Sequence, residues 1–288
     1  MGVSVKDIYI RDPFVLPHGD ALYMYGTTDA SAWGGEANGF KCYKTFDLEK
    51  FDDLGFVFRR TDDFWANENF WAPEVHFYNG KFYMFASFFR KGKCRASQIL
   101  MSDAPEGPFT PLNDPITPPE RECLDATLYV DSGEPYIVYC HEWLQIKDGA
   151  ILYQKLSNDL TVTVDEPKIL FRASSAPWTA PIDGDCYITD GPFLRRLKSG
   201  KLLMLWSSNA QDGYAMGTAV SDGGKIHGPW RHISKPLVSK GGGHGMIFEF
   251  KNALYISFHS PNHPPLSERA QFYAVKERND RLGILRRL

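Results

Sequence analysis

Short apolar segments with the character of β-strands recur along the whole chain at a nearly regular spacing. Their starting points lie 52 to 66 residues apart. The segments are LYMYGTT from Leu22, FYMFAS from Phe82, YIVYCH from Tyr136, LLMLWSS from Leu202 and LYISFH from Leu254. Each follows a first strand and a tight turn that contains Gly, Asn, Asp or Ser, which is the turn chemistry of β-hairpins. Helical periodicity is nearly absent, so the pattern predicts an all-β fold.

A repeat of about 58 residues with several strands per unit is typical of a β-propeller. Third and fourth strands follow more weakly in the units, and a Gly-Pro-aromatic motif recurs at Gly107 and Gly228. Five four-stranded blades account for almost the whole length. We therefore expect a single domain, residues 1–288, folded as a five-bladed β-propeller with a central channel. A β-sandwich with a similar number of strands is the alternative, but it gives no reason for the regular spacing.

An isolated polar residue precedes each apolar segment by 8 to 12 residues. These residues are Asp12, Glu74, Asp125, Asp190 and His244. The nearly constant offset places one polar side chain at the same point of each repeat, so we expect all five to converge at one mouth of the channel. The second strand of each hairpin returns to that face, and His141 and Glu142 at the end of YIVYCHEW are expected there too.

Clustered carboxylates raise one another's proton affinity, so one can stay protonated while another ionises. That division supplies a general acid and a general base in one pocket. With tryptophan and tyrosine nearby, the chemistry it favours is hydrolysis of a glycosidic bond. A single aspartate in Asp-Pro or Asp-Gly is usually a turn residue. Three aspartates at one blade position are harder to explain in that way.

Composition and charge narrow the class of partner. The net charge is -3, from 32 Lys and Arg against 35 Asp and Glu, and no basic stripe favours nucleic acid or an anionic membrane. No apolar stretch approaches the roughly 20 residues needed to span a bilayer. The first residues lack the features of a signal peptide, and the five cysteines lack metal-ligand spacing. We therefore expect a cytoplasmic protein, or one that is exported with a leader absent from this sequence.

The ordered motifs resemble glycoside hydrolase family 43, five-bladed propeller enzymes that act on arabinose- and xylose-containing glycans. The segments that carry the resemblance are IRDPFV at 10–15, FWAPEV at 70–75, LDATLYVD at 124–131, TDGPFL at 189–194, GGHGMIF at 242–248 and ERAQFYAV at 268–275. The resemblance implies an inverting glycosidase that needs no cofactor for its chemistry. A single compact module suits an exo-acting α-L-arabinofuranosidase or β-xylosidase on plant-type oligosaccharides or polysaccharide side chains. The alternatives are a propeller glycosidase of different sugar specificity and a non-catalytic carbohydrate-binding propeller.

The resemblance also implies catalytic roles. Asp12 corresponds to the base that activates water, and Asp125 to the aspartate that tunes and orients the acid. The family's acid is usually a glutamate in an EGP motif, whereas this chain has Asp190 in TDGPFL. Aspartate is one methylene shorter, and a displacement of about 1 Å can cost on the order of 100-fold in rate. Three interpretations stay open: Asp190 is the acid, Glu142 supplies the proton while Asp190 binds sugar hydroxyls, or the acid is lost.

Other residues are expected to bind an ion or the substrate. His244 matches a histidine that holds calcium or a similar ion near the channel axis in the family, and the alternative is a buried histidine bonded to the backbone. Arg269 matches the family's substrate-contacting arginine, and the alternative is a surface ion pair with Glu268 or a neighbour. The remaining candidates for the substrate pocket are Trp33, Trp71, Glu74, His141 and Trp143.

Overall fold

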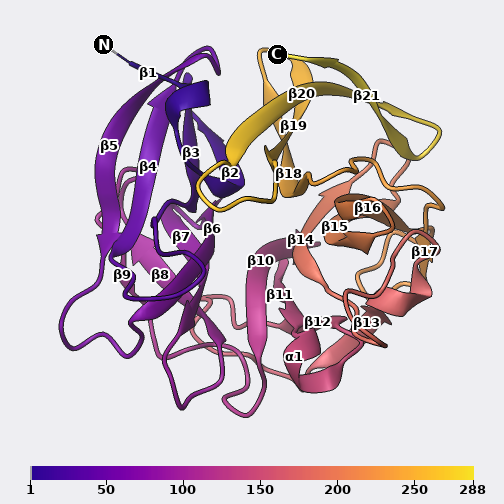
Figure 1. Ribbon diagram of the computed structural model, residues 1–288, viewed down its shortest axis with the longest axis horizontal. Helices are drawn as coiled ribbons and strands as arrows, with labels where there is room; N and C mark the ends of the chain where they lie inside the picture. Colours follow the sequence, from indigo (N-terminus) through magenta and orange to yellow (C-terminus); the bar gives the residue numbers. More distant parts are fainter. Residues whose placement is uncertain (1) are drawn as a thin grey trace.

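The computed structural model describes residues 2–288 as five antiparallel β-sheets that follow one another in chain order around a centre (Figure 1). The predicted all-β, five-bladed propeller is confirmed, and the β-sandwich is excluded. Helical structure in the described part is limited to α1 (Trp143–Ile146) and the 3-10 turns η1 (Val5–Asp7) and η2 (Ala173–Ser175). Among residues 2–288, no helix has the length and apolar character that crossing a membrane requires.

Each blade is a sheet of four consecutive strands, and the first blade gains the short β1 at its outer edge. From the centre outward, the first blade contains β2 (Arg11–His18), β3 (Ala21–Thr27), β4 (Gly39–Thr45), β5 (Lys50–Arg59) and β1 (Val3–Ser4). The second contains β6 (Glu68–Tyr78), β7 (Lys81–Phe89), β8 (Ala96–Ser102) and β9 (Thr110–Pro111). The third contains β10 (Cys123–Asp131), β11 (Glu134–His141), β12 (Ala150–Lys155) and β13 (Lys168–Arg172). The fourth contains β14 (Asp190–Arg196), β15 (Leu202–Ala210), β16 (Gly213–Ser221) and β17 (Trp230–His232). The fifth contains β18 (Gly243–Phe250), β19 (Ala253–Ser260), β20 (Arg269–Arg278) and β21 (Arg281–Arg287).

The ring closes where the fifth blade meets the first. Within residues 2–288 each sheet consists only of consecutive strands, so no strand is shared between the first and last blades. Ser257 of β19 donates a hydrogen bond to the carbonyl of Pro13 at 2.7 Å. Arg11 of β2 forms an ion pair at 2.8 Å with Glu268, whose side chain is fully buried. Polar contacts between the first and last blades therefore accompany the apolar packing at this junction.

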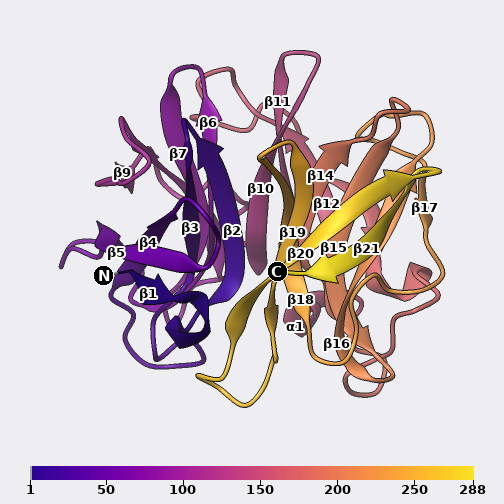
Figure 2. The same cartoon turned by 90° about the horizontal axis from the view of Figure 1, so that it is seen from above.

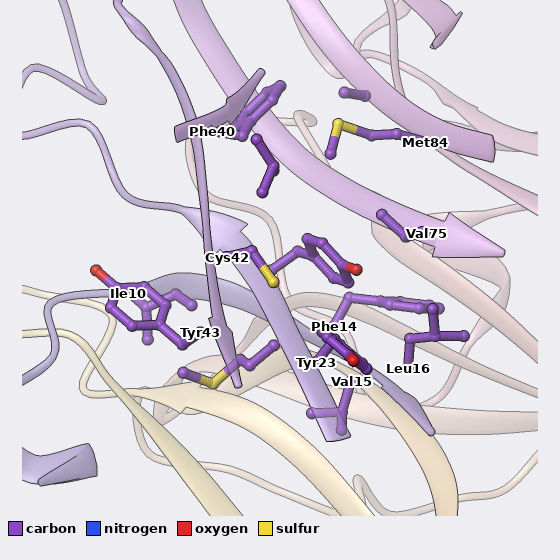
Figure 3. Packing of buried hydrophobic residues seen from close by; sticks show 14 of the residues in the cluster. Ile10, Phe14, Val15, Leu16, Tyr23, Phe40, Cys42, Tyr43, Val75 and Met84 are labelled. Carbon is purple, nitrogen blue, oxygen red and sulfur yellow. The ribbon is translucent and has the colours of Figure 1, made fainter. Parts of the chain in front are cut away.

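Apolar side chains fill the spaces between neighbouring blades. Figure 3 shows part of the cluster in which Phe14 and Tyr23 of the first blade pack with Val75 and Met84 of the second. Separate clusters join the second blade to the third, the third to the fourth and the fourth to the fifth. Burial of large aromatic and aliphatic side chains stabilises these contacts by roughly 1.5–3 kcal/mol for each side chain. Because each cluster belongs to more than one blade, the innermost strands hold fixed positions relative to one another.

Every innermost strand contains a β-bulge near its start, and a residue with positive φ lies at each bulge. Bulges redirect side chains and are common beside active sites. Aspartate, histidine and glycine enter the left-handed region more readily than most residues, so four of the five bulges carry well-suited residues. The bulge residues are Asp12 (φ 53°), Ala72 (φ 46°), Asp125 (φ 55°), Gly191 (φ 51°) and His244 (φ 48°).

The equivalence of the five polar residues, as predicted from the sequence, is wrong in two blades. The bulge positions of the second and fourth blades are occupied by Ala72 and Gly191, not by Glu74 and Asp190. Counted from the bulge residues, the offset to each apolar segment is 10 or 11 residues in all five blades. Glu74 lies two residues further along β6, and Asp190 lies directly before its bulge.

Candidate active site

The bulges are connected from blade to blade by hydrogen bonds. At four of them the backbone N–H donates to a side chain near the end of the second strand of the preceding blade. At the fourth blade the Gly191 N–H instead donates to Asp125 Oδ2 at 3.1 Å. This network fixes the backbone that carries the polar side chains. The four acceptors are His259 Nδ1 for Asp12 (3.2 Å), Thr27 Oγ1 for Ala72 (2.9 Å), Ser87 Oγ for Asp125 (2.8 Å) and Ser207 Oγ for His244 (2.8 Å).

Asp12 is buried among groups that favour its ionised form. Its Oδ2 accepts a hydrogen bond from Thr27 Oγ1 at 2.7 Å, and its Oδ1 lies 3.2 Å from His244 Nδ1 and 3.3 Å from His259 Nδ1. Burial alone would raise the pKa of Asp12, but His244 and the Arg11 guanidinium hold it well below the usual range of a carboxyl group. Asp12 is therefore a carboxylate that can accept a proton.

Asp125 lies on the other side of the His244 imidazole. Its Oδ2 is 3.6 Å from His244 Nδ1, the same nitrogen that faces Asp12. Burial and the charge of Asp12 raise the pKa of Asp125 well above its ordinary value, and the hydrogen bond from Gly191 opposes that rise. One nitrogen of the His244 ring therefore faces carboxyl oxygens from two different blades. His244 thus links the side chains of Asp12 and Asp125.

Asp190 has properties different from those of Asp12. Its Oδ2 accepts a hydrogen bond from the Tyr214 hydroxyl at 2.9 Å, and part of its surface faces the pocket. Burial and the charge of Asp125 raise the pKa of Asp190 to about 7, against the opposing effect of His244. Near neutral pH this carboxyl group can hold a proton. One site therefore combines an ionised carboxylate with a carboxyl group that can donate a proton.

These groups lie in a cavity of about 510 Å³ whose wall comes from all five blades and from the loops that follow them. In Figure 2, α1 and the loop between β19 and β20 lie at the same face, the lower one in that view, and both contribute to the wall. The lining residues used below are Asp12, Trp33, Trp71, Arg95, Asp125, Glu142, Trp143, Leu144, Ile182, Asp190, His244 and His263.

The three tryptophans predicted for the substrate pocket all line it. Trp33 stacks on His263 with ring centroids 5.6 Å apart and meets Trp71 edge-on at 6.1 Å. Trp71 is held in place because its Nε1 donates to the carbonyl of Ala32 at 2.6 Å. Trp143, the first residue of α1, lines the wall beside the third blade. Their stacking on a sugar ring stays a prediction.

Glu142 also lines the cavity, beside a guanidinium. Its Oε2 lies 3.7 Å from Arg95 Nε, and the side chains of both residues are about nine-tenths buried. Burial raises the pKa of Glu142, while Arg95 counteracts the shift. Glu142 therefore has a positively charged partner, whereas Asp190 has neutral Tyr214 and a neighbouring carboxyl group.

A family model for glycosyl hydrolases family 43 matches residues 4–280 of the chain. The chain belongs to this family. The resemblance found in the sequence motifs is thereby confirmed. Since family 43 consists of glycosyl hydrolases, the predicted class of enzyme agrees with the match.

Individual relatives fall within the same family or carry related names. The structure of an endo-arabinase from Bacteroides thetaiotaomicron VPI-5482 superimposes with a TM-score of 0.90 at 40% identity, over 96% of this chain and 98% of that one. A thermostable family-43 glycoside hydrolase gives a TM-score of 0.85 at 27% identity, over 96% and 92%. The xylosidase/arabinosidase 43A of Humicola insolens is 28% identical over 182 residues, which is 58% of this chain. That match spans about half, 54%, of the Humicola protein.

Three residues predicted to contact substrate are absent from the cavity wall. Glu74 is buried two residues beyond the bulge of β6, with its Oε2 3.2 Å from His76 Nε2. His141 turns to Gln145, whose Oε1 lies 2.6 Å from its Nε2. Arg269 donates to the backbone carbonyls of Lys6, Leu266 and Glu268. The alternative ion pair of Arg269 with Glu268 does not form, because the Glu268 carboxylate pairs with Arg11.

Four residues of the site were not predicted from the sequence: Arg95 and Tyr214 at the cavity, and Thr27 and His259 beside Asp12. Arg95 and Tyr214 belong to no recurring motif, so no pattern in a single sequence identifies them. Thr27, Ser87, Ser207 and His259 occupy the same place at the ends of the second strands. That recurrence was a usable signal.

The residues around His244 do not fit the predicted calcium site. Its Nδ1 faces the carboxylates of Asp12 and Asp125, and within residues 2–288 no three His, Cys, Asp or Glu side chains are grouped so that they could hold a metal ion. Calcium takes about six to eight oxygen ligands. An ion bound to the other ring nitrogen, Nε2, would have to take almost all of its ligands from water. The geometry instead makes His244 a partner of the two aspartates.

Proposed function

We propose that this family 43 chain is an exo-acting glycosidase that removes terminal α-L-arabinofuranosyl groups from oligosaccharides with inversion. The observation that carries the proposal is the division of carboxyl groups in one cavity. Asp12 is held ionised, and the pKa of Asp190 is raised to about 7. A base and an acid with such different proton affinities are what inverting hydrolysis requires.

In the proposed mechanism Asp12 removes a proton from a water molecule as the water oxygen attacks the anomeric carbon. The bond from that carbon to the leaving-group oxygen breaks, and Asp190 transfers its proton to that oxygen. Burial beside Asp125 favours the protonated form of Asp190, and the hydrogen bond that Asp125 accepts from the Gly191 N–H holds the backbone next to the acid. After product release, Asp12 loses the proton to solvent and Asp190 regains one.

The shape of the cavity favours exo-action. Contacts of Trp33 with His263 and with Trp71 form a continuous aromatic wall across the fifth, first and second blades. Leu144 and Ile182 supply a wall beyond the third blade. A pocket bounded on several sides accepts the end of a glycan chain, whereas endo-action requires a groove open at both ends.

The choice of arabinose is supported by the names of the relatives. The 40% identical Bacteroides thetaiotaomicron protein is described as an endo-arabinase, and the Humicola insolens relative as a xylosidase/arabinosidase. The name of the Bacteroides thetaiotaomicron protein also indicates the competing mode of action, which is endo-action. β-Xyloside hydrolysis remains the second candidate for the sugar.

The test combines aryl glycosides with a linear arabinan. We expect nitrophenol release from the aryl α-L-arabinofuranoside to exceed that from the β-xyloside, and proton NMR to show the inverted anomer of arabinose first. Linear arabinan should yield only arabinose at early times. Early release of arabino-oligosaccharides would replace exo-action by endo-action. Binding of arabinose without turnover of any aryl glycoside would identify a non-catalytic carbohydrate-binding protein.

The dependence of kcat/KM on pH should have its alkaline limb near pH 7. Asp190 has a raised pKa of about 7, so it is protonated and active below that value and loses its proton as the pH rises through it. Asp12 has a depressed pKa, so it stays ionised over the working range and contributes no acid limb above the ordinary carboxyl range. Initial rates between about pH 4 and pH 9 measure this profile. An alkaline limb that persists in Asp190→Asn would exclude Asp190 as its source.

A further inference from the structure

Arg95 and Glu142 form a pair that the proposed mechanism does not use. Arg95 lies in the turn before β8, and its guanidinium stacks over the Trp71 ring at 3.9 Å from the ring centroid. The Phe89 ring lies 5.0 Å away. A planar guanidinium stacks favourably on aromatic faces at such distances. The wall of the cavity therefore holds a cation, stacked on Trp71, beside Glu142.

The two side chains are close but make no hydrogen bond with each other. Arg95 Nε and Glu142 Oε2 are 3.7 Å apart, beyond hydrogen-bond distance, and both atoms are buried without a partner. Arg95 Nη1 is likewise buried without a partner. Among residues 2–288, neither side chain forms a hydrogen bond with any residue. Buried charged groups that lack hydrogen bonds are costly to keep unless something else satisfies them.

A guanidinium only donates hydrogen bonds, and a carboxylate only accepts them. A hydroxyl group does both, so a single hydroxyl in the cavity can accept from Arg95 and donate to Glu142 at the same time, through the side-chain atoms Nη2 and Oε1, which are not among the fully buried ones. We propose that the Arg95–Glu142 pair determines specificity by binding one hydroxyl of the sugar, an inference that rests on the proposed glycosidase function. A neutral sugar is favoured because Glu142 already faces the Arg95 guanidinium and the ionised Asp12 lies in the same cavity, so a further carboxylate would be repelled.

The test uses aryl α-L-arabinofuranosides that each lack one hydroxyl, at carbon 2, 3 or 5. For the wild-type enzyme we expect one of the three analogues to lose roughly 10- to 100-fold in kcat/KM beyond the loss shared by the others, as expected for a hydrogen bond to charged groups. In the double variant Arg95→Met/Glu142→Gln the parent substrate should lose a similar factor. The sensitive analogue should then lose nothing further, because the groups that bind its missing hydroxyl are gone.

Stability measurements separate recognition from a structural role. Each single variant leaves one buried charge unpaired and should lower the melting temperature, whereas the double variant removes both charges and should melt close to the wild type. The matched control is Arg195→Met, which breaks the Arg195–Glu249 pair, whose residues do not line this cavity. We expect it to leave the discrimination among the three analogues unchanged.

Two results would overturn the inference. One is a double variant that melts well below the wild type but keeps the full discrimination among the analogues, because the pair would then be structural. The other is a loss in Glu142→Gln that depends on the leaving group and not on the sugar hydroxyls, because Glu142 would then donate the proton.

If the wild type cleaves no arabinofuranoside, the proposed function fails independently of the pair. Calorimetric titration with L-arabinose and D-xylose then tests the pair directly. The double variant should bind its preferred sugar roughly 10- to 100-fold more weakly than the wild type. Equal binding by both proteins would exclude the pair from sugar recognition.

Discussion

The Asp12→Asn variant is expected to fold normally and to lose about 10²- to 10⁴-fold in kcat, the range for removal of a general base. The asparagine side chain has the same shape, and its oxygen can still accept the hydrogen bond from Thr27. The link from the residue-12 N–H to His259 belongs to the backbone and is retained. A neutral amide cannot take a proton from water, so the attack on the anomeric carbon loses its base.

The loss in Asp12→Asn should be similar for substrates with good and poor leaving groups, because the attacking water needs the base in the same displacement step whichever group departs. Initial rates on aryl arabinofuranosides of graded leaving-group pKa measure this. Asp20→Asn is the matched control, since Asp20 lies exposed in the turn between β2 and β3 of the same blade. It should retain full activity. An Asp12→Asn enzyme with more than about a tenth of the wild-type rate would remove Asp12 from the role of base.

The fold could be predicted from the sequence because each blade repeats the same alternation of strand, turn and strand. The exact residue at each bulge could not be predicted. Glu74 and Asp190 are the polar residues nearest the repeat position, yet Ala72 and Gly191 occupy it. In a strand, a shift of one residue turns a side chain to the opposite face, and a bulge adds a further shift. A polar residue alone therefore does not locate the bulge.

The positions of the arginine side chains were harder to predict than the bulge residues. Arg269 lies within a family motif, but its guanidinium donates to three backbone carbonyls near the loop that ends at Glu268. Arg95 lies in a short turn with no motif and reaches the cavity by stacking on Trp71, which is 24 residues earlier in the chain. Such contacts depend on tertiary packing between turns and strands. Periodicity in a single sequence carries no information about them.

Replacement of Asp190 by alanine is expected to separate leaving groups sharply. A poor leaving group, such as the next arabinose of an oligosaccharide, needs a proton as its bond breaks and should lose roughly 10³-fold in kcat/KM. A nitrophenolate leaves without that proton, so its loss should be about tenfold or less. The alkaline limb near pH 7 should disappear from the remaining activity on nitrophenyl substrates, because the group with the raised pKa is gone.

Glu142→Ala is the comparison that decides between the two candidate acids. Glu142 has Arg95 beside it, which favours its ionised form, whereas burial and the charge of Asp125 raise the pKa of Asp190 to about 7. The Glu142 variant should therefore lose activity by a similar factor on good and poor leaving groups. If instead Glu142→Ala shows the steep dependence on leaving group and Asp190→Ala does not, the proton comes from Glu142. Asp190 would then be a sugar-binding residue, and its shorter side chain would no longer need to reach the leaving-group oxygen.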